Sequence, residues 1–425
     1  MKLLVIGGGG REHAIIQKLK ENPAVETVYA LPGNGGIALD AECVGIKATD
    51  IPAIVAFAKE KAVDFAVVTP DDPLVLGAAD ALREIGIPTF GPSKNAAQIE
   101  GSKVFAKELM QKYGIPTAKY AVFTELSAAL DYIQTAPIPT VIKADGLALG
   151  KGVVIAQSRS EAEQALRSMM EATVFGESGS RVVIEEFLTG PEVSVLSFTD
   201  GDVVVPMVSS MDHKRALDGD QGLNTGGMGT VAPNPYYTPE IAKVCMETIF
   251  LPTIRAMKQE GREFRGCLYF GLMLTPDGPK VIEYNCRFGD PETQVVLPLL
   301  KTDLLTIMQA TAAGRLRQLD IQWEDACAWC VVLASKGYPQ SYEKGFPITL
   351  PALKDGQYLY LAGVRAENGM LLTNGGRVLG AVSVRPALRD AIDDAYALAD
   401  AVYFENAYCR RDIGARAMQA YQEVR

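Results

Sequence analysis

Short apolar runs alternate with longer amphipathic segments over the first hundred residues. Residues 2–6 read KLLVI, and the strand-like runs VETVYA, DFAVVTP and IPTF follow along the chain. Helix-like segments separate them, among them REHAIIQKLK and an apolar stretch near 52–61. This alternation predicts a parallel α/β sheet, a fold that binds ligands at the carboxyl ends of its strands. One continuous helix is expected next, over about 93–112.

The pattern changes beyond the turn YGIPTA. TVIKADG, GVVIAQS and RVVIEEFL predict strands, and SEAEQALRSMMEA predicts a helix between the last two. A mixed region with the strand-like runs GCLYFGLMLT and PKVIEYN reaches about residue 320. Short strands follow from about 326, and a helical RDAIDDAYALADAVYF lies near the end. We therefore expect a multidomain protein with α/β and α+β parts.

Composition narrows the class of protein. The chain has 425 residues, 48% of them apolar and 22% charged, with a net charge of −10. An acidic balance argues against a nucleic-acid or anionic-membrane surface. The longest apolar runs, such as ACAWCVVLAS, are too short to span a bilayer, and MKLLVIGGGG lacks a secretory apolar region. We expect a soluble cytoplasmic protein with no nucleic-acid or membrane partner.

The cysteines and histidines exclude several chemistries. Cys327 and Cys330 form a C-x-x-C motif within a strand-like run, where residues three apart face opposite sides. A shared metal or redox role is therefore disfavoured against buried apolar packing. His13 and His213 are the only histidines of the sequence. A histidine-rich metal site is excluded, and acid–base chemistry must use carboxylates or at most one histidine.

The stretch KADGLALGKG, residues 143–152, resembles a phosphate-binding P-loop but does not match one. With Gly150 and Lys151 as the G-K pair of G-x-x-x-x-G-K-[ST], Asp145 stands where a glycine is needed and Gly152 where Ser or Thr is needed. The glycines and lysines still suit phosphate binding. A Walker nucleotide site is a poor explanation for them.

A second glycine-rich loop, Gly7–Gly10, follows the first predicted strand. It fails the dinucleotide pattern G-x-G-x-x-G, because neither Glu12 nor His13 is a glycine or alanine. A strand-to-helix turn of this kind exposes backbone N–H groups at the positive end of a helix, which suits a phosphate monoester. An anion site and a plain tight turn remain equally open at this point.

The stretch PKVIEYNCRFGDPE combines hard metal ligands with an arginine. Alternation along a strand places Glu283 and Asn285 on one face, and Arg287 follows on the same side. A carboxylate and a carbonyl oxygen form half of a Mg²⁺ site, whose other positions water and phosphate oxygens fill. The alternative is an exposed strand face with charges. Asp290 and Glu292 nearby favour the functional interpretation.

Two other segments are more ambiguous. In VVIEEFLTGPEVSVLSF a hinge at Leu188 offers backbone groups to an adenine edge, and Glu192 offers a carboxylate to a ribose; a strand with one wet face is as good an explanation. In MDHKRALDGDQGLNTGGMGT a basic cluster precedes glycines that permit loop closure over a ligand. A flexible surface loop is the alternative there.

Taken together, these blocks resemble the ATP-grasp superfamily and, within it, the phosphoribosylamine–glycine ligases. The resemblance runs nearly end to end, from LLVIGGGGREHA through GPSKNAAQIEGSKVFAK and NTGGMG to EYNCRFGDPETQ and YCRRDIGARA. It implies an N-terminal parallel α/β domain over 1–101 and a small mixed β/α domain over 323–425. Between them it implies an ATP-grasp domain of two α+β lobes over 102–322, with a mobile small lobe at about 118–190.

The resemblance also implies roles for individual residues. The ATP contacts would be Lys103, Lys143, Gly150, Lys151, Glu185, Glu186, Leu188 and Glu192. The substrate contacts would be Gly8, Gly9, Gly10, Asp212, Lys214, Arg287 and Asp290. The ligands of Mg²⁺ or Mn²⁺ would be Glu283 and Asn285, and the catalytic residues Arg287 and Lys143. Residues 146–152 would close over the phosphates as a flap.

The implied reaction joins glycine to 5-phosphoribosylamine with ATP, through a glycyl phosphate, in purine biosynthesis by a monomer. One departure is visible: Thr69 and Asp71 stand where the family is expected to have a glycine and a glutamate. Three rivals are an ATP-grasp carboxylase acting through carboxyphosphate, a nicotinamide oxidoreductase and a non-catalytic nucleotide-binding scaffold. The ligase-specific blocks argue against the carboxylase, and the missing third glycine argues against the oxidoreductase. The complete set of candidate site residues argues against a non-catalytic scaffold.

Overall fold

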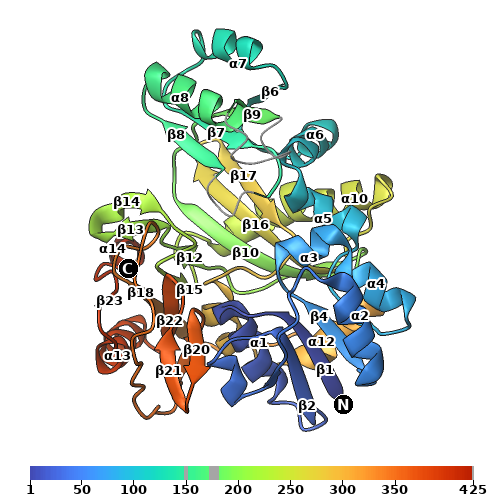
Figure 1. The fold of residues 1–425 in the computed structure, drawn as a ribbon. Coiled ribbons are helices and arrows are strands. Elements are labelled where there is room, and N and C mark those ends of the chain that lie inside the picture. The colour runs from blue at the N-terminus through green and yellow to red at the C-terminus, as the bar shows by residue number, and fades with distance from the viewer. Residues whose placement is uncertain (148–151, 172–180, 424–425) are drawn as a thin grey trace.

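A parallel sheet of five strands forms the N-terminal part of the protein (Figure 1). The structure, a computed structural model, describes residues 1–147, 152–171 and 181–423. The strand order is β3-β2-β1-β4-β5, which confirms the α/β prediction. These strands are β1 (Lys2–Gly7), β2 (Thr27–Pro32), β3 (Glu42–Cys43), β4 (Phe65–Val68) and β5 (Thr89–Phe90).

Alternation along β1 packs both faces of this sheet. Leu4 and Ile6 lie in one hydrophobic core and Leu3 and Val5 in another, and all four are fully buried. Side chains of successive strand residues point to opposite faces, so a continuous apolar run such as KLLVI suits a sheet covered on both sides. The helices of this region are α1 (Gly10–Leu19), α2 (Ile51–Glu60), α3 (Asp71–Leu76), α4 (Ala78–Glu84), α5 (Lys94–Gly101) and α6 (Lys103–Tyr113).

The expectation of one continuous helix over about 93–112 is wrong. The chain leaves helical geometry at Ser102, which ends α5 and begins α6. The Ser102 hydroxyl accepts a hydrogen bond from the N–H of Phe105, as an N-cap does, so the apolar periodicity continues across a break that a serine makes. The break turns α6 toward the upper part of the molecule (Figure 1).

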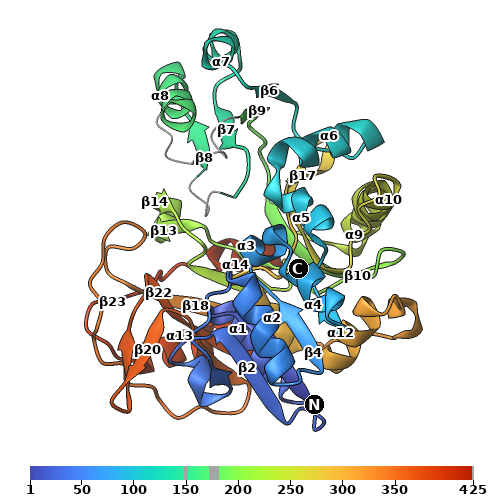
Figure 2. The same cartoon turned by 45° about the vertical axis from the view of Figure 1, so that its right-hand side comes forward.

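A small lobe stands at one end of the molecule and has a core of its own (Figures 1 and 2). Its antiparallel sheet has the order β6-β9-β7-β8, and two helices cover it. Its elements are β6 (Tyr120–Phe123), α7 (Leu126–Ile133), β7 (Thr140–Ala144), β8 (Val153–Ala156), α8 (Arg159–Met170) and β9 (Val182–Glu186).

A larger lobe carries the second antiparallel sheet, in the order β11-β10-β16-β17. Its strands are β10 (Glu192–Thr199), β11 (Val204–Pro206), β16 (Gly266–Thr275) and β17 (Gly278–Asn285). The helices nearby in the chain are α9 (Pro239–Cys245), α10 (Leu251–Gln259), α11 (Thr293–Val296) and α12 (Leu304–Ala312). The N-terminal sheet and this lobe share two hydrophobic cores, so they pack as one body.

The last sheet joins the C-terminal region to the middle of the chain. Strands β12 (Met211–Asp212) and β15 (Gly229–Ala232) extend the sheet of β18 (Cys327–Ser335), β22 (Arg377–Arg385) and β19 (Gln357–Leu361), with β23 (Ala407–Tyr408) beside β18. Two hairpins stand outside it, β13 (Arg215–Leu217) with β14 (Gln221–Asn224), and β20 (Val364–Glu367) with β21 (Met370–Thr373). The helices are α13 (Leu388–Ala401) and α14 (Ala415–Glu423).

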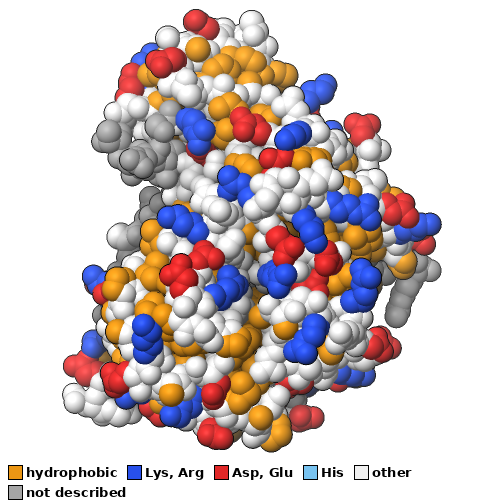
Figure 3. All heavy atoms as spheres, turned by 90° about the vertical axis from the view of Figure 1, so that its right-hand side faces the viewer, with side chains coloured by type: hydrophobic (Ala, Val, Ile, Leu, Met, Phe, Trp, Pro, Cys, Tyr) orange, Lys and Arg blue, Asp and Glu red, His pale blue; other side chains and the backbone are white. Residues whose placement is uncertain are grey.

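Two further observations concern the helices and one face of the molecule. Within the described ranges, no helix is both long enough and apolar enough to cross a bilayer. On the face drawn in Figure 3, acidic and basic side chains are intermixed rather than gathered into a patch of one sign.

Candidate active site

The loops after β1 and β4 meet where the strand order of the N-terminal sheet reverses, which is where such sheets bind ligands. Glu12 links them. Its Oε2 accepts a hydrogen bond of 2.5 Å from the Gly9 N–H, and its Oε1 accepts one of 2.7 Å from the Thr69 hydroxyl. Thr69, the departure noted in the sequence, is therefore built into the support of the glycine loop. The Glu12 carboxylate also occupies the N-terminus of α1, so the Gly9 N–H is already used.

Gly8 borders a cavity of about 500 Å³ between the carboxyl ends of β1 and β2 and the hairpin β20–β21. A Cβ at position 8 would lie 2.4 Å from the Gly33 carbonyl oxygen, so only glycine fits there. Asn34 holds the wall together, because its amide donates to the carbonyls of Gly8, at 3.0 Å, and Leu361, at 2.9 Å. Of the loop residues expected to face the sugar phosphate, Gly8 thus lines a cavity to which the C-terminal region contributes.

Glu283 and Asn285 lie at the end of β17, at the junction of the two lobes. Both are half-buried and Tyr284 between them is buried, as the alternation predicts. The register with β16 shifts between Gly271 and Leu272, which leaves Ile282 without a residue opposite it. A β-bulge of this kind disrupts the ladder locally. The Ile282 carbonyl instead accepts a hydrogen bond of 3.0 Å from the Lys143 ammonium.

Arg287 follows on the same side and is held by Glu100. Its Nη2 lies 3.0 Å from Glu100 Oε1 and donates to Asn285 Oδ1 at 3.3 Å. Burial alone would lower the pKa of Arg287, but the Glu100 carboxylate raises it, so the guanidinium stays charged. Its Nε is buried without a hydrogen-bond partner among the described residues. Unpaired buried N–H groups are costly, and one on a fixed guanidinium suits an anionic ligand.

Lys143 and Lys103 reach the same junction from the other side. Lys143, on β7, lies 3.0 Å from Glu185 Oε1, and Lys107, on α6, lies 2.9 Å from Glu185 Oε2. Lys103 Nζ donates to the Gly146 carbonyl at 2.7 Å, and burial lowers its pKa. Burial likewise lowers the pKa of Lys107 to about 8. Glu185 therefore acts through its carboxylate as the shared counter-ion of two lysines.

The chain between β9 and β10 connects the lobes. The Glu186 carboxylate accepts a hydrogen bond of 2.9 Å from the Lys119 N–H and lies 3.7 Å from the Lys280 ammonium. The Leu188 backbone makes no hydrogen bond within the described residues, and its side chain is half-buried. A fixed segment with free backbone groups fits the expectation that this hinge reads an adenine edge.

Lys214 lies between two carboxylates of the large lobe. Its ammonium is 3.7 Å from Glu283 Oε1 and 3.8 Å from Glu192 Oε2. Partial burial opposes the charge on Glu283, but Lys214, Lys143 and Lys103 outweigh it and hold the pKa of Glu283 below its usual range. Asp212 behaves oppositely, because burial and the neighbouring Glu292 raise its pKa well above the usual range.

Asp290 and Arg377 connect this group to the N-terminal loop. Arg377, on β22, lies 3.3 Å from Asp290 Oδ2 and donates to the carbonyls of Gly226 and Asp290. A Cβ on Gly9 would lie 3.4 Å from Asp290 Oδ2, and a Cβ on Gly227 would lie 2.6 Å from Asp212 Oδ1. Asp290 therefore lies beside the Gly7–Gly10 loop and Asp212 beside Gly227, and Arg377 links Asp290 to the Gly226 carbonyl.

The structure thus places most of the expected residues at the lobe junction or beside the Gly7–Gly10 loop. Gly150 and Lys151 lie outside the described residues. Sequence reasoning missed Glu12, Glu100, Lys107 and Arg377, each of which holds an expected site residue in place. Glu100 and Lys107 stand close to Lys103 in the sequence, so a buried charge in an otherwise amphipathic helix was a usable signal. Arg377 had no local signal, because its partners lie 87 to 151 residues away.

The donor set fits a nucleotide-bound Mg²⁺ better than a resident metal. Glu283 and Asn285 offer two oxygens, and no group of three or more His, Cys, Asp or Glu able to hold a metal occurs in the part of the chain that the structure describes. Mg²⁺ keeps several waters and binds through one or two carboxylates together with phosphate oxygens in such sites.

Comparison with known families covers almost the whole chain. The N domain of phosphoribosylglycinamide synthetase matches residues 1–100, its ATP-grasp (A) domain matches 101–293 and its C domain matches 328–416. A phosphoribosylamine–glycine ligase of Vibrio cholerae is 48% identical over 99% of this chain and 100% of its own length. One of Caldanaerobacter subterraneus is 48% identical over 98% of this chain and 100% of its length.

Solved structures show the same relation. The phosphoribosylamine–glycine ligase of Thermotoga maritima superposes with a TM-score of 0.85 at 35% identity, covering 97% of this chain and 100% of that one. The biotin carboxylase domain of the Hydrogenobacter thermophilus 2-oxoglutarate carboxylase, solved with magnesium ADP and bicarbonate, gives a TM-score of 0.75 at 17% identity over 96% and 91% of the chains. The second likeness shows the shared fold alone.

Proposed function

Because this chain belongs to the phosphoribosylglycinamide synthetase family, the phosphoribosylamine–glycine ligases, we propose that it joins glycine to 5-phospho-D-ribosylamine at the expense of ATP. The products are glycinamide ribonucleotide, ADP and phosphate, in purine biosynthesis. The observation that carries this proposal is that the lobe junction gathers Lys143, Lys214, Glu283 and Arg287, while Asp290 lies beside the Gly7–Gly10 loop.

The first step is phosphoryl transfer. A carboxylate oxygen of glycine attacks the γ-phosphorus of ATP, ADP leaves, and glycyl phosphate forms. Lys143 of the small lobe and Lys103 at the start of α6 would bind the phosphates, and the free Nε of Arg287 would bind the transferring group. Pre-positioned cations of this kind stabilise the charge of the transition state without reorganising. Mg²⁺ held by Glu283 and Asn285 would supply further charge neutralisation on the phosphate oxygens.

The second step is amide formation. The amine of phosphoribosylamine attacks the carbonyl carbon of glycyl phosphate, loses one proton, and expels phosphate. The acyl phosphate must be kept from water, which favours closure of the small lobe over the junction. We assign the sugar phosphate to the cavity beside Gly8, glycine to the region of Asp212, Lys214 and Asp290, and ATP to the junction at Glu186, Leu188 and Glu192. No enzyme-bound covalent intermediate is required.

The proposal is tested by omitting each substrate in turn. ADP release should require ATP, glycine, Mg²⁺ and phosphoribosylamine, the last made in place from ribose 5-phosphate and ammonia. Bicarbonate in place of glycine separates the ligase from a carboxylase of the same fold. ADP release that proceeds equally without glycine, or that depends on bicarbonate, would exclude the proposed reaction. NAD(P)H should not bind.

We further propose that the protein is a cytoplasmic monomer without nucleic-acid or membrane partners. The mixed surface of Figure 3 and the net charge of −10 support a chain that stays apart from copies of itself and from polyanions. Sedimentation equilibrium should give a mass near 45.7 kDa.

A further inference from the structure

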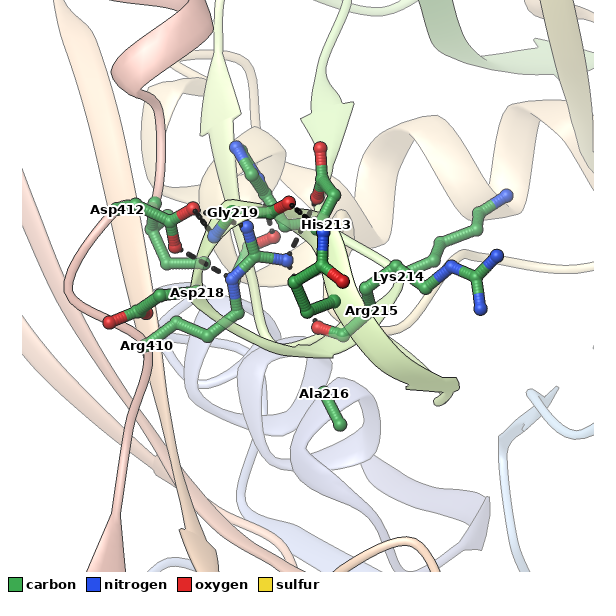
Figure 4. Close-up of polar contacts among 12 residues, drawn as sticks. His213, Lys214, Arg215, Ala216, Asp218, Gly219, Arg410 and Asp412 are labelled. Atoms are coloured by element: carbon green, nitrogen blue, oxygen red, sulfur yellow. Dashed lines mark hydrogen bonds and ion pairs between the residues drawn. The ribbon is translucent and has the colours of Figure 1, made fainter.

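The C-terminal segment Tyr408–Gly414 lies against the hairpin β13–β14, and we call this segment the clasp (Figure 4). Arg410 is at its centre and is 1% exposed. Its guanidinium forms a two-pronged pair with Asp412, Nε to Oδ1 at 2.8 Å and Nη2 to Oδ2 at 2.7 Å. The remaining nitrogen, Nη1, donates to the Arg215 carbonyl and to Asp220 Oδ1, both at 3.0 Å.

Further hydrogen bonds run along the same contact. Asp412 Oδ2 accepts from the Gly219 N–H at 2.8 Å, and Asp218 Oδ1 accepts from the Arg411 N–H at 2.8 Å. The Tyr408 hydroxyl donates to the Ala216 carbonyl at 2.7 Å. The clasp therefore makes hydrogen bonds to the first strand of the hairpin and to the turn that connects its two strands.

The clasp also fixes the chain just before the hairpin. The Gly414 N–H donates to His213 Nε2 at 2.9 Å, which leaves the proton of His213 on Nδ1, facing the Gly229 carbonyl at 3.2 Å. Lys214 is the next residue. The clasp thus binds the His213 side chain on one side of Lys214 and the Arg215 carbonyl on the other.

The hairpin also receives an ion pair from Arg416, whose Nη2 lies 2.7 Å from Asp220 Oδ2. It is a two-stranded ribbon outside the large sheets, and its apolar residues Leu217 and Leu223 are 48% and 51% exposed. A two-stranded hairpin is at best marginally stable on its own. Its position therefore depends on the residues that bind it. Arg410 binds both the Arg215 carbonyl and the Asp220 carboxylate of the hairpin.

We propose that Arg410 is a positioning residue that acts through Lys214, keeping the Lys214 ammonium between Glu283 and Glu192. This assignment rests on the proposed function of the junction. Arg410 itself is remote from the reacting groups and touches the site only through the hairpin backbone. Loss of the guanidinium leaves Asp412 without its two-pronged partner, frees the Arg215 carbonyl and leaves Asp220 with Arg416 alone, so the hairpin shifts and Lys214 shifts with it.

The test is a double-mutant cycle between Arg410→Gln and Lys214→Met. Misplacement of a contacting group by about 1 Å costs about 100-fold in rate, so Arg410→Gln should lower kcat by that order while the KM for ATP stays unchanged. In the Lys214→Met background, Arg410→Gln should lower kcat no further, because the group it positions is gone. Arg410→Lys, which keeps the charge but not the fork, should recover part of the loss.

Arg385→Gln is the matched control. Arg385 forms a half-buried pair with Asp394, at 2.6 Å, in the same region but away from the hairpin. It should lower the melting temperature without lowering kcat. The positioning role would be overturned if Arg410→Gln and Lys214→Met lowered kcat multiplicatively in the double mutant. It would also be overturned if Arg410→Gln and Arg385→Gln lowered kcat equally.

Hydrogen exchange separates this inference from the proposed reaction. Amides of 215–224 should exchange faster in Arg410→Gln than in Arg385→Gln, whatever reaction the enzyme performs. A wild-type enzyme without glycine-dependent ADP release refutes the function, whereas unchanged exchange in the hairpin refutes the clasp. If Arg410→Gln does not fold, Asp412→Asn weakens the same two-pronged ion pair and replaces it in the double-mutant cycle with Lys214→Met. The same results then support or overturn the positioning role.

Discussion

Three lysines converge on the carboxylate of Glu283, and Lys214 is 3.7 Å from it. Their charge keeps its pKa low, so Glu283 is ionised at neutral pH. An ionised carboxylate beside Asn285 suits the binding of a phosphate-bound cation.

Glu283→Gln keeps the shape of the side chain and removes its charge. We expect turnover to fall by about 100-fold or more, because the variant loses a charged ligand for Mg²⁺ at the transferring group. The apparent Mg²⁺ requirement should rise in a titration of ADP release. Asp277→Asn, in the exposed turn between β16 and β17, is the control and should change neither quantity. Wild-type turnover of Glu283→Gln at limiting Mg²⁺ would refute the metal role.

His213 makes the folding stability of the protein depend on pH. Burial, followed by the charges of Arg410 and Arg416, lowers its pKa to about 4, while Gly229 and Asp220 act in the opposite direction. The unfolded chain takes up a proton near pH 6.5, and the native protein does not do so until about pH 4. This contribution to stability is therefore complete above pH 6.5 and is lost as the pH falls toward 4.

The expected size of this loss is about 3 kcal/mol between pH 7 and pH 4. Urea unfolding of wild type and His213→Gln at both pH values measures it. The variant should be less stable at pH 7, and its stability should fall less on acidification. Equal falls in the two proteins would show that His213 does not titrate with folding.

At the scale of the element, two constraints require a glycine at position 414, before helix α14. The φ of Gly414 is +75°, and a Cβ there would lie 1.7 Å from Trp329 Cζ2. Gly414→Ala should therefore cost about 3 kcal/mol or more of unfolding free energy, from the left-handed backbone and the overlap with a buried ring. Gly369, at φ +77° with nothing within 4 Å, provides the comparison. Gly369→Ala should cost about 1 kcal/mol; equal losses would argue against the overlap.

The sequence predicts a structural feature correctly where neighbouring residues determine it, and not where pairing with a distant strand does. The alternation in VIEYN places Glu283 and Asn285 on one face correctly, because strand geometry is a property of neighbouring residues. The bulge at Ile282, which gives Lys143 its carbonyl acceptor, follows from pairing with β16 and has no local signal. The break at Ser102 had one, since serine is a favoured N-cap, but continuous apolar periodicity concealed it.

At the scale of the molecule, the sequence resemblance gives the order of the domains and not how they share elements. Strands β12 and β15 come from the middle of the chain and complete the C-terminal sheet. Arg377 of that sheet then holds Gly226 and Asp290 beside the candidate site. Contacts between residues this far apart depend on the assembled fold, so the C-terminal region becomes a support of the site only once the structure is known.

The small lobe forms a unit of its own in the part of the chain that the structure describes (Figure 1). It has its own core, and its link to the large lobe includes Lys143 to the Ile282 carbonyl and the Glu186–Lys280 pair. ATP held between Lys143 and Glu283 would add bonds across this link. A ligand that binds one arrangement preferentially stabilises it.

We therefore expect a non-hydrolysable ATP analogue with Mg²⁺ to slow amide hydrogen exchange in β7, β9 and β17, which face the junction. Exchange in β1 and β4 of the N-terminal sheet should not change, because their cores are shared with the large lobe already. Lys143→Met removes one of the contacts across the junction and should reduce the protection in β7 and β9. Protection that spreads evenly over all the sheets, or that is the same in Lys143→Met, would show that ATP does not join the lobes through this residue.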